Sequence, residues 1–162
     1  MMGVGLVRVA VPADAPALGD VHVACWREAY AHLFSPAFLA ALNVDERRQQ
    51  WARRLAGPGP GQALVAVADG RIVGLAWSGP SRDEPPVREL ELSGLYLLAA
   101  QHGTGLGQAL LDAALGNRPA SLWTAEDNPR AVAFYARNGF TADGACKVEP
   151  SWEDLAEVRL VR

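Results

Sequence analysis

Three alternating glycines stand where a predicted strand gives way to a predicted helix. They occupy positions 103, 105 and 107, after the apolar run Leu95-Tyr96-Leu97-Leu98 and a short loop. Consecutive backbone N–H groups at a helix N-terminus bind anions, and glycines let the chain approach a diphosphate closely. A tight turn that needs positive φ would also use glycine, but three glycines exceed what an ordinary turn requires. The pattern therefore favours phosphate binding by a glycine turn made of Gly103, Thr104, Gly105, Leu106 and Gly107.

The strand that leads into the glycine turn, predicted over Val87 to Leu98, changes its pattern half-way. Leucines at the even positions 90 and 92 give way to leucines at the odd positions 95 and 97. A one-residue slip in a period-two pattern, at the Ser93-Gly94 step, predicts a β-bulge. A strand buried on both faces would give a similar sequence, because Tyr96 is apolar too. The pattern alone leaves both interpretations open.

Other short signals predict the elements around this strand and turn. Asp69-Gly70 between two apolar runs predicts a hairpin with a type I′ turn, and Asn128-Pro129 predicts a helix cap and first helical residue. Asp14 is placed to cap the first helix. The charged runs Glu46-Arg47-Arg48 and Arg53-Arg54 are typical of a solvated helix face. The predicted elements are a strand over 3–9, helices to 33 and over 38–55, strands over 64–68, 71–73 and 87–98, a helix ending at 115, a strand over 120–125, a helix to 138 and two last strands ending at 161.

This order predicts an α/β fold with a sheet of mixed direction. The length of 162 residues predicts one domain, 1–162, and 50% hydrophobic with 20% charged residues excludes a disordered chain. A net charge of −3 gives no basic footprint for nucleic acid, and no signal peptide or membrane span is visible. Cys25 and Cys146 lack metal-ligand spacing and are interpreted as two reduced core thiols of a cytoplasmic protein.

The glycine turn and the segment from Asn128 to Phe140 together resemble the GCN5-related N-acetyltransferase superfamily. Gly105 and Gly107 match the two glycines of its acetyl-CoA signature, Gln/Arg-x-x-Gly-x-Gly/Ala, and His102 departs from the signature at the Gln/Arg position. The later segment is similar to the family's Asn-x-x-Ala-x-x-Phe-Tyr-x-x-x-Gly-Phe. The resemblance covers nearly the whole chain. It implies an acyl-CoA N-acyltransferase fold, with a mixed, mostly antiparallel sheet, a bulged fourth strand and about four flanking helices.

The resemblance also implies acetyl-CoA as co-substrate and no metal. Splayed strands leave backbone groups unpaired, so the cofactor's pantetheine arm would bond to the backbone of Leu95, Tyr96 and Leu97. A backbone N–H there could also meet the developing oxyanion. The diphosphate would lie on the glycine turn beside His102. Asn128, which is already explained as a helix cap, would contact the cofactor arm as well.

Tyr135 matches the family's tyrosine that protonates the coenzyme A thiolate, and a core aromatic beside Phe134 is the alternative interpretation. A base must also deprotonate the incoming ammonium. Glu91 shares a strand face with Glu89 and lies nearer the expected acetyl position, so Glu91 is the hypothesised base. A surface carboxylate would look the same in the sequence.

Trp26 and Tyr30, one helical turn apart, are hypothesised to wall the acceptor pocket, although this spacing is also typical of a helix core. The predicted function is therefore transfer of acetyl from acetyl-CoA to a primary amine of a small molecule or peptide, in a ternary complex. The family often pairs through its C-terminal strands, so a homodimer is a possible assembly.

Two other functions compete with this one. A non-catalytic acyl-CoA-binding module would keep the fold without turnover, and an intact Tyr135 speaks against it. A dinucleotide-binding protein would also place glycines between a strand and a helix, with Glu126-Asp127 about 20 residues on. That fold needs several strand-helix repeats, whereas residues 62–98 are predicted as consecutive strands.

Overall fold

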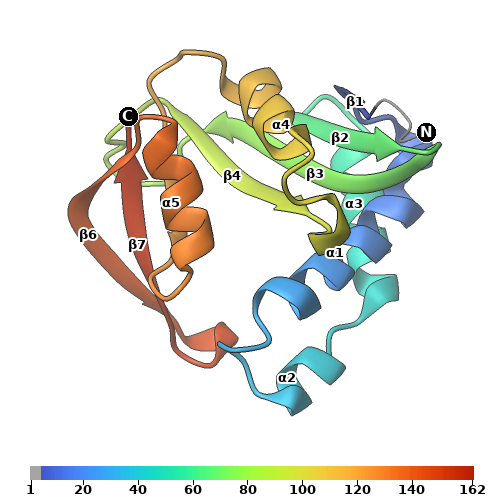
Figure 1. The fold of residues 1–162 in the computed structure, drawn as a ribbon, viewed down its shortest axis with the longest axis horizontal. Helices are drawn as coiled ribbons and strands as arrows, with labels where there is room; N and C mark the ends of the chain where they lie inside the picture. Colours follow the sequence, from blue (N-terminus) through green and yellow to red (C-terminus); the bar gives the residue numbers. More distant parts are fainter. Residues whose placement is uncertain (1–4) are drawn as a thin grey trace.

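The computed structural model describes residues 5–162 (Figure 1). The two positions Gly3 and Val4 of the predicted first strand lie outside these residues. In chain order the elements are β1 (Leu6–Val9), α1 (Ala15–Ala29), α2 (Pro36–Ala40), α3 (Val44–Leu55), β2 (Gln62–Ala68), β3 (Arg71–Pro80), β4 (Leu90–Leu97), α4 (Leu106–Leu115), β5 (Ser121–Ala125), α5 (Pro129–Arg137), β6 (Thr141–Glu149) and β7 (Leu155–Val161).

The seven strands described form one sheet in the order β1-β2-β3-β4-β5-β7-β6. Neighbouring strands are antiparallel from β1 to β4 and again across β5, β7 and β6. Within residues 5–162, β4 and β5 form the only parallel pair. The predicted mixed, mostly antiparallel sheet is therefore confirmed. A doubly wound parallel sheet, which a dinucleotide-binding protein would need, is excluded for these residues.

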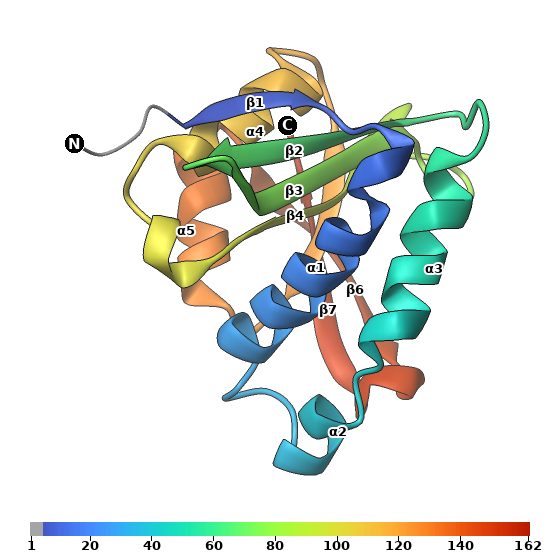
Figure 2. The ribbon, with the colours of Figure 1, turned by 90° about the vertical axis from the view of Figure 1, so that its right-hand side faces the viewer.

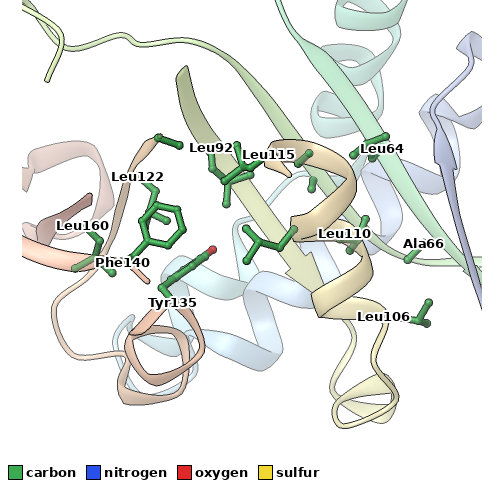
Figure 3. Close-up of a cluster of buried hydrophobic side chains, with 14 of the residues drawn as sticks. Leu64, Ala66, Leu92, Leu106, Leu110, Leu115, Leu122, Tyr135, Phe140 and Leu160 are labelled. Carbon is green, nitrogen blue, oxygen red and sulfur yellow. The ribbon is translucent and has the colours of Figure 1, made fainter. Parts of the chain in front are cut away.

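Helices cover both faces of the sheet (Figure 2). On one face, Val65 and Leu75 contribute to a core that includes Leu18 of α1 and Trp51 of α3. On the other face, side chains such as Leu64 of β2 form a second core with α4, Tyr135 and Phe140 (Figure 3). Successive side chains of a strand point to opposite faces, so adjacent residues 64 and 65 enter different cores.

The predicted bulge in β4 is confirmed. Trp77 of β3 pairs with Gly94, but the next residue, Ser78, pairs with Leu92, so Ser93 has no partner on β3. β4 then pairs with β5 at only two positions, Glu91 with Ser121 and Leu92 with Leu122. Beyond Leu92 the two strands separate, which leaves the last residues of β4 with a partner on one side only.

The helices differ from the prediction in number and limits. The described residues contain five α-helices instead of about four, because the stretch predicted over 38–55 is two helices. Ser35 caps α2, and the Asn43 side chain caps α3 by accepting from the Glu46 N–H. The first helix ends at Ala29, before the predicted Leu33.

Three local predictions, for Asp14, the two cysteines and the Asp69-Gly70 turn, can be compared with the structure. The Asp14 side chain does not cap α1; it accepts hydrogen bonds from Arg8 and from the Val11 N–H instead. Cys25 is buried as predicted, but Cys146 is exposed on β6, so its assignment to the core is wrong. The Asp69-Gly70 turn has positive φ at both residues, as a type I′ turn requires.

None of the helices described in residues 5–162 has the length and hydropathy to cross a membrane.

Candidate active site

A cavity of about 1080 Å³ opens where β4 and β5 separate. Residues of α1, β4, the glycine turn, β5, α5 and β7 line it. The cavity therefore draws on both faces of the sheet, because the gap between the two strands connects them. A volume of this size suits a ligand larger than most metabolites.

The backbone of β4 faces this gap at alternate residues. The Leu98 N–H bonds to the Val73 carbonyl on β3, so by alternation Tyr96 also directs its backbone groups to β3. Leu95 and Leu97 consequently direct theirs to the side from which β5 has departed. The Leu97 carbonyl accepts from the His102 ring Nε2–H, at 3.1 Å. Leu95 thus keeps free backbone groups at the gap, and Tyr96 contributes its side chain to the lining.

The glycine turn is shaped as an anion site. Gly103 and Gly105 have φ of 79° and 90°, in the left-handed region, and a Cβ on either would meet no other atom within 4 Å. The backbone N–H groups of Gly103, Gly105, Gly107 and Gln108 donate no hydrogen bond to any described residue. Unsatisfied N–H groups at a helix start attract negative charge.

The remaining two residues of the turn hold it in place. Leu106 is buried in the core beneath α4, and the Thr104 hydroxyl donates to the Gln101 carbonyl at 2.7 Å. Neither side chain lines the cavity. A Cβ on Gly107 would lie 3.8 Å from Leu97, at ordinary contact distance.

Tyr135 is both a core aromatic and a lining residue of the cavity. Its ring packs beside Phe134 and Phe140, and Figure 3 shows its hydroxyl pointing away from Leu160. The hydroxyl makes no hydrogen bond with the described residues. Burial raises the pKa of Tyr135 above its ordinary value, so the phenol carries its proton at neutral pH.

Asn128 lies at the N-terminus of α5 and lines the same cavity. Its side-chain Oδ1 accepts from the Ala131 N–H at 3.3 Å, so the predicted cap is present. The amide N–H₂ of the same side chain is left over for a ligand. One residue can therefore cap the helix and contact a bound molecule.

Glu91 is not in the cavity lining. It is fully buried in β4, and its carboxylate accepts from the Arg82 backbone N–H and from the Arg82 guanidinium, at 2.7 Å in each case. Both carboxylate oxygens are therefore occupied, and Arg82 stands between Glu91 and solvent. Glu89 is exposed and lies outside the cavity as well. The geometry speaks against either carboxylate as the base.

A different carboxylate, Glu157 of β7, lines the cavity and is buried. Lys147 lies 3.7 Å from it. Burial raises the pKa of Glu157 above its ordinary value, and Lys147 opposes this rise. Sequence reasoning missed this residue because it sits in the last strand, where no motif marks it. Glu157 lies two residues after Leu155, on the same face of the strand. This alternation indicates only that one face of the strand is buried.

The predicted aromatic wall is present and larger than expected. Trp26 is buried and Tyr30 half-buried, with ring centroids 5.1 Å apart, and both line the cavity. The Tyr30 and Tyr96 hydroxyls lie 3.4 Å apart. On the other side of Tyr96, Trp77 lies over the β4 backbone at Gly94, where a Cβ would meet its ring at 2.3 Å. The aromatic side chains therefore adjoin the open part of β4.

Two arginines of α3 complete this side of the cavity. Arg47 and Arg54 line it, so the solvated face predicted for the charged runs that contain them is wrong at these two residues. Arg48, between them in sequence, does face outward and bonds to Asp20. The helical spacing of positions 47, 51 and 54 indicates this orientation, because the three residues share one helix face and Trp51 is buried on it.

Comparison with known proteins identifies the family. The profile described as "Acetyltransferase (GNAT) family" matches residues 21–140. The chain belongs to the GNAT family. It is accordingly an acyltransferase.

Similar proteins in two bacteria are named N-acetyltransferases. An uncharacterized N-acetyltransferase of Mycobacterium tuberculosis is 35% identical over 137 residues, covering 80% of this chain and 74% of that one. An uncharacterized N-acetyltransferase of Bacillus subtilis is 29% identical over 169 residues, covering 94% and 95%.

Solved structures share the fold. A GCN5-related N-acetyltransferase of Rhodopseudomonas palustris superposes with a TM-score of 0.72 at 24% identity, covering 100% of this chain and 97% of that one. The PaiA N-acetyltransferase of Thermoplasma acidophilum, in complex with coenzyme A, gives a TM-score of 0.66 at 19% identity, covering 96% and 98%.

Proposed function

We propose that this protein transfers an acetyl group from acetyl-CoA to a primary amine, with both substrates held in the cavity between β4 and β5. The observation that carries the proposal is the meeting of three features in one cavity. They are unbonded N–H groups at the start of α4, an unpaired edge of β4 and the protonated phenol of Tyr135. The coenzyme A complex of the PaiA relative supports the same cofactor.

The glycine turn would hold the diphosphate of the cofactor on its free N–H groups. Residues 103 and 105 offer no side chain that would keep a phosphate away from the backbone. The pantetheine arm would then run along the open edge of β4, where Leu95 keeps its backbone groups free. Asn128 would contribute its amide N–H₂ from the start of α5.

The chemistry requires one acid and one base. Glu157 would take a proton from the ammonium, and the neutral nitrogen would then form its bond to the acetyl carbon. As the carbon–sulfur bond breaks, Tyr135 would give its proton to the sulfur. The second proton that the nitrogen loses would restore the Tyr135 hydroxyl. A backbone N–H of β4 would stabilise the negative charge that develops on the acetyl oxygen.

Glu157 replaces Glu91 in this mechanism because of where the two carboxylates lie. Glu157 lines the cavity on β7, and its raised pKa makes it a better proton acceptor than an ordinary glutamate. Glu91 is occupied by Arg82. The function stays the same whichever carboxylate acts.

The experiment that tests the function is incubation of the protein with acetyl-CoA and a library of amines. Free thiol is measured with a thiol reagent, and N-acetylated amine by mass spectrometry. The proposal predicts thiol release that depends on the amine, in equal amount to the acetylated product. If acetyl-CoA binds but no amine yields product, a non-catalytic acyl-CoA-binding module becomes the better description.

A further inference from the structure

Arg47 and Arg54 present two charged groups to the cavity without a carboxylate partner. Within residues 5–162 neither guanidinium forms an ion pair, whereas Arg48 on the same helix pairs with Asp20 and Asp45. Arg82, the other arginine at this end of the cavity, is held by Glu91. Arg47 is half-buried, and the negative charge nearest to it along the helix is the adjacent, exposed Glu46.

Both guanidiniums lie against aromatic rings. The Arg47 Cζ is 5.7 Å from the centroid of the Trp26 ring, and the Arg54 Cζ is 5.1 Å from that of Trp77. Burial lowers the pKa of each, and for Arg54 the charges of Arg82 and Arg47 lower it further. Cation–π contact offsets part of this cost, but it provides no hydrogen-bond acceptor for the N–H groups.

A buried histidine adds a further donor to the same place. His22 is buried and its Nδ1 accepts from the Trp51 indole N–H at 3.1 Å, so in the neutral ring the proton is on Nε2. Burial lowers the pKa of His22 to about 3, so the ring is neutral at pH 7. Its Nε2–H makes no hydrogen bond with the described residues.

These groups surround a small recess of the main cavity. A space of about 60 Å³ is lined by His22, Arg47, Trp51, Arg54 and Trp77, together with Gln50. Apart from that amide, its polar groups at neutral pH are hydrogen-bond donors. A set of donors with two positive charges is complementary to an anionic oxygen group, which supplies only acceptors.

The recess belongs to the acceptor side of the cavity. α3 covers the face of the sheet opposite to α4, so the two arginines and the glycine turn lie on different faces (Figure 2). The recess is nevertheless close to the reaction site, because the His22 and Tyr96 rings are 5.1 Å apart and Tyr96 adjoins the gap. A cofactor phosphate on the glycine turn would leave these arginines free.

We propose that Arg47 and Arg54 bind an anionic group, a carboxylate or a phosphate, on the acceptor amine. The acceptor is then a molecule with an amine at one end and an anion at the other. This proposal rests on the proposed acetyl transfer and specifies its substrate class. His22 donates to the same anion, and the aromatic side chains contact the part between the two ends.

The test compares matched pairs of amines in the thiol-release assay. The pairs are tryptophan with tryptamine, lysine with cadaverine, β-alanine with ethylamine, and phosphoethanolamine with ethanolamine. We expect the anionic member of at least one pair to have a kcat/KM about 10- to 100-fold above that of its partner, the gain typical of a hydrogen-bonded charge pair. A preference confined to phosphoethanolamine identifies a phosphate, and one confined to amino acids identifies a carboxylate.

Variants locate the effect. Arg47→Gln and Arg54→Gln should raise KM for the preferred amine about 10-fold or more and leave KM for acetyl-CoA unchanged. Arg53→Gln is the matched control, because Arg53 is the neighbour of Arg54 on the same helix and does not line the cavity. Arg54→Lys, which keeps the charge, should restore part of the loss.

The outcomes separate the two proposals. If no amine is acetylated, the proposed function itself fails. If amines are acetylated but the members without an anionic group equal their anionic partners, and Arg47→Gln and Arg54→Gln match the wild type, the acceptor proposal alone is wrong. A measurement on the wild type avoids any folding defect: benzoate and inorganic phosphate are tested as inhibitors. Competition by either against the amine supports the proposal, and no inhibition by both overturns it.

Discussion

Proton transfer in this cavity depends on residues whose burial sets their protonation state. Burial keeps the Tyr135 phenol protonated, and burial of Glu157 raises the pKa of its carboxyl group. Tyr135 can therefore donate a proton and Glu157 can accept one. Neither property follows from residue type, since both depend on what the folded chain places around the side chain.

Replacing Tyr135 by phenylalanine tests the acid. Tyr135→Phe keeps the ring in its contacts with Phe134 and Phe140 and removes a hydroxyl that bonds to no described residue, so stability should change little. Turnover should fall by about 10²- to 10⁴-fold while affinity for acetyl-CoA is kept. Steady-state kinetics and calorimetry measure the two quantities. Wild-type turnover in the variant would reduce Tyr135 to a core aromatic.

The pH dependence of kcat/KM tests Glu157 against Glu91. In the wild type the rate should fall with falling pH as Glu157 takes up a proton, at a pH above that of an ordinary glutamate because its pKa is raised. The charged groups that influence it are Lys147, Glu149 and Arg82. Glu157→Gln should lower kcat/KM at neutral pH, with partial recovery at alkaline pH, where the amine loses its proton unaided.

Glu91→Gln is the matched control for this profile. It weakens the bonds to Arg82, whose side chain is 65% exposed, so we expect a loss of about 1–2 kcal/mol in unfolding free energy. The shape of the pH profile should stay that of the wild type. A profile altered by Glu91→Gln and untouched by Glu157→Gln would return the role of base to Glu91.

The sequence predicts the position of some of these site residues better than that of others. Tyr135 and Asn128 lie in a motif whose spacing places them on one helix, and the structure puts both in the cavity. The hypothesis for Glu91 rests on strand alternation, which gives the face of a strand but not the partner that binds a side chain. The Arg82 that binds it comes from the loop before β4, and loop conformation follows from tertiary contacts rather than from periodicity.

Local sequence signals predict a structural element correctly where the physical constraint acts between residues close in the chain. The Ser93-Gly94 slip predicts the bulge, and Trp77 explains why residue 94 is glycine. The break between α2 and α3 also has a local signal, an Asn43 cap with Glu46 three residues on. The sequence nevertheless predicts one helix here, because Ala41 and Leu42 continue the apolar helical pattern of the residues before them.

The junction of β1 and α1 allows a stability prediction. Asp14 accepts from two nitrogens of Arg8, at 2.7 and 2.9 Å, and from the Val11 N–H, and these bonds lower its pKa. A lowered pKa contributes stability above the unfolded value, near 3.9, that is lost as pH falls through the folded value. Asp14→Asn should therefore cost about 1–2 kcal/mol at pH 7 and progressively less below about pH 4.

Urea unfolding of the wild type and Asp14→Asn over this pH range measures the difference. Asp20→Asn is the control, because Asp20 pairs with Arg48 at an exposed site and should change stability little. A cost at Asp14 that does not shrink in acid would show that the charge of this carboxylate is not what stabilises the junction.

For the whole molecule, the separation of β4 from β5 joins two halves of one cavity across the sheet. The α4 and α5 face supplies the glycine turn, Asn128 and Tyr135, and the α1 and α3 face supplies the aromatic side chains and arginines. The central claim is that the first half holds acetyl-CoA, with the diphosphate on the glycine turn. The second half is then free for the amine.

Calorimetric titration of acetyl-CoA into Gly105→Asp and Gly144→Asp tests this claim most directly. Gly105 and Gly144 have φ of 90° and 91°, and a Cβ at either meets nothing within 4 Å, so aspartate strains both backbones alike. Of these two glycines, only Gly105 lines the cavity. We predict that Gly105→Asp, folded by circular dichroism, loses measurable affinity, while Gly144→Asp binds as the wild type does. Wild-type affinity in Gly105→Asp, or an equal loss in both variants, would contradict the assignment.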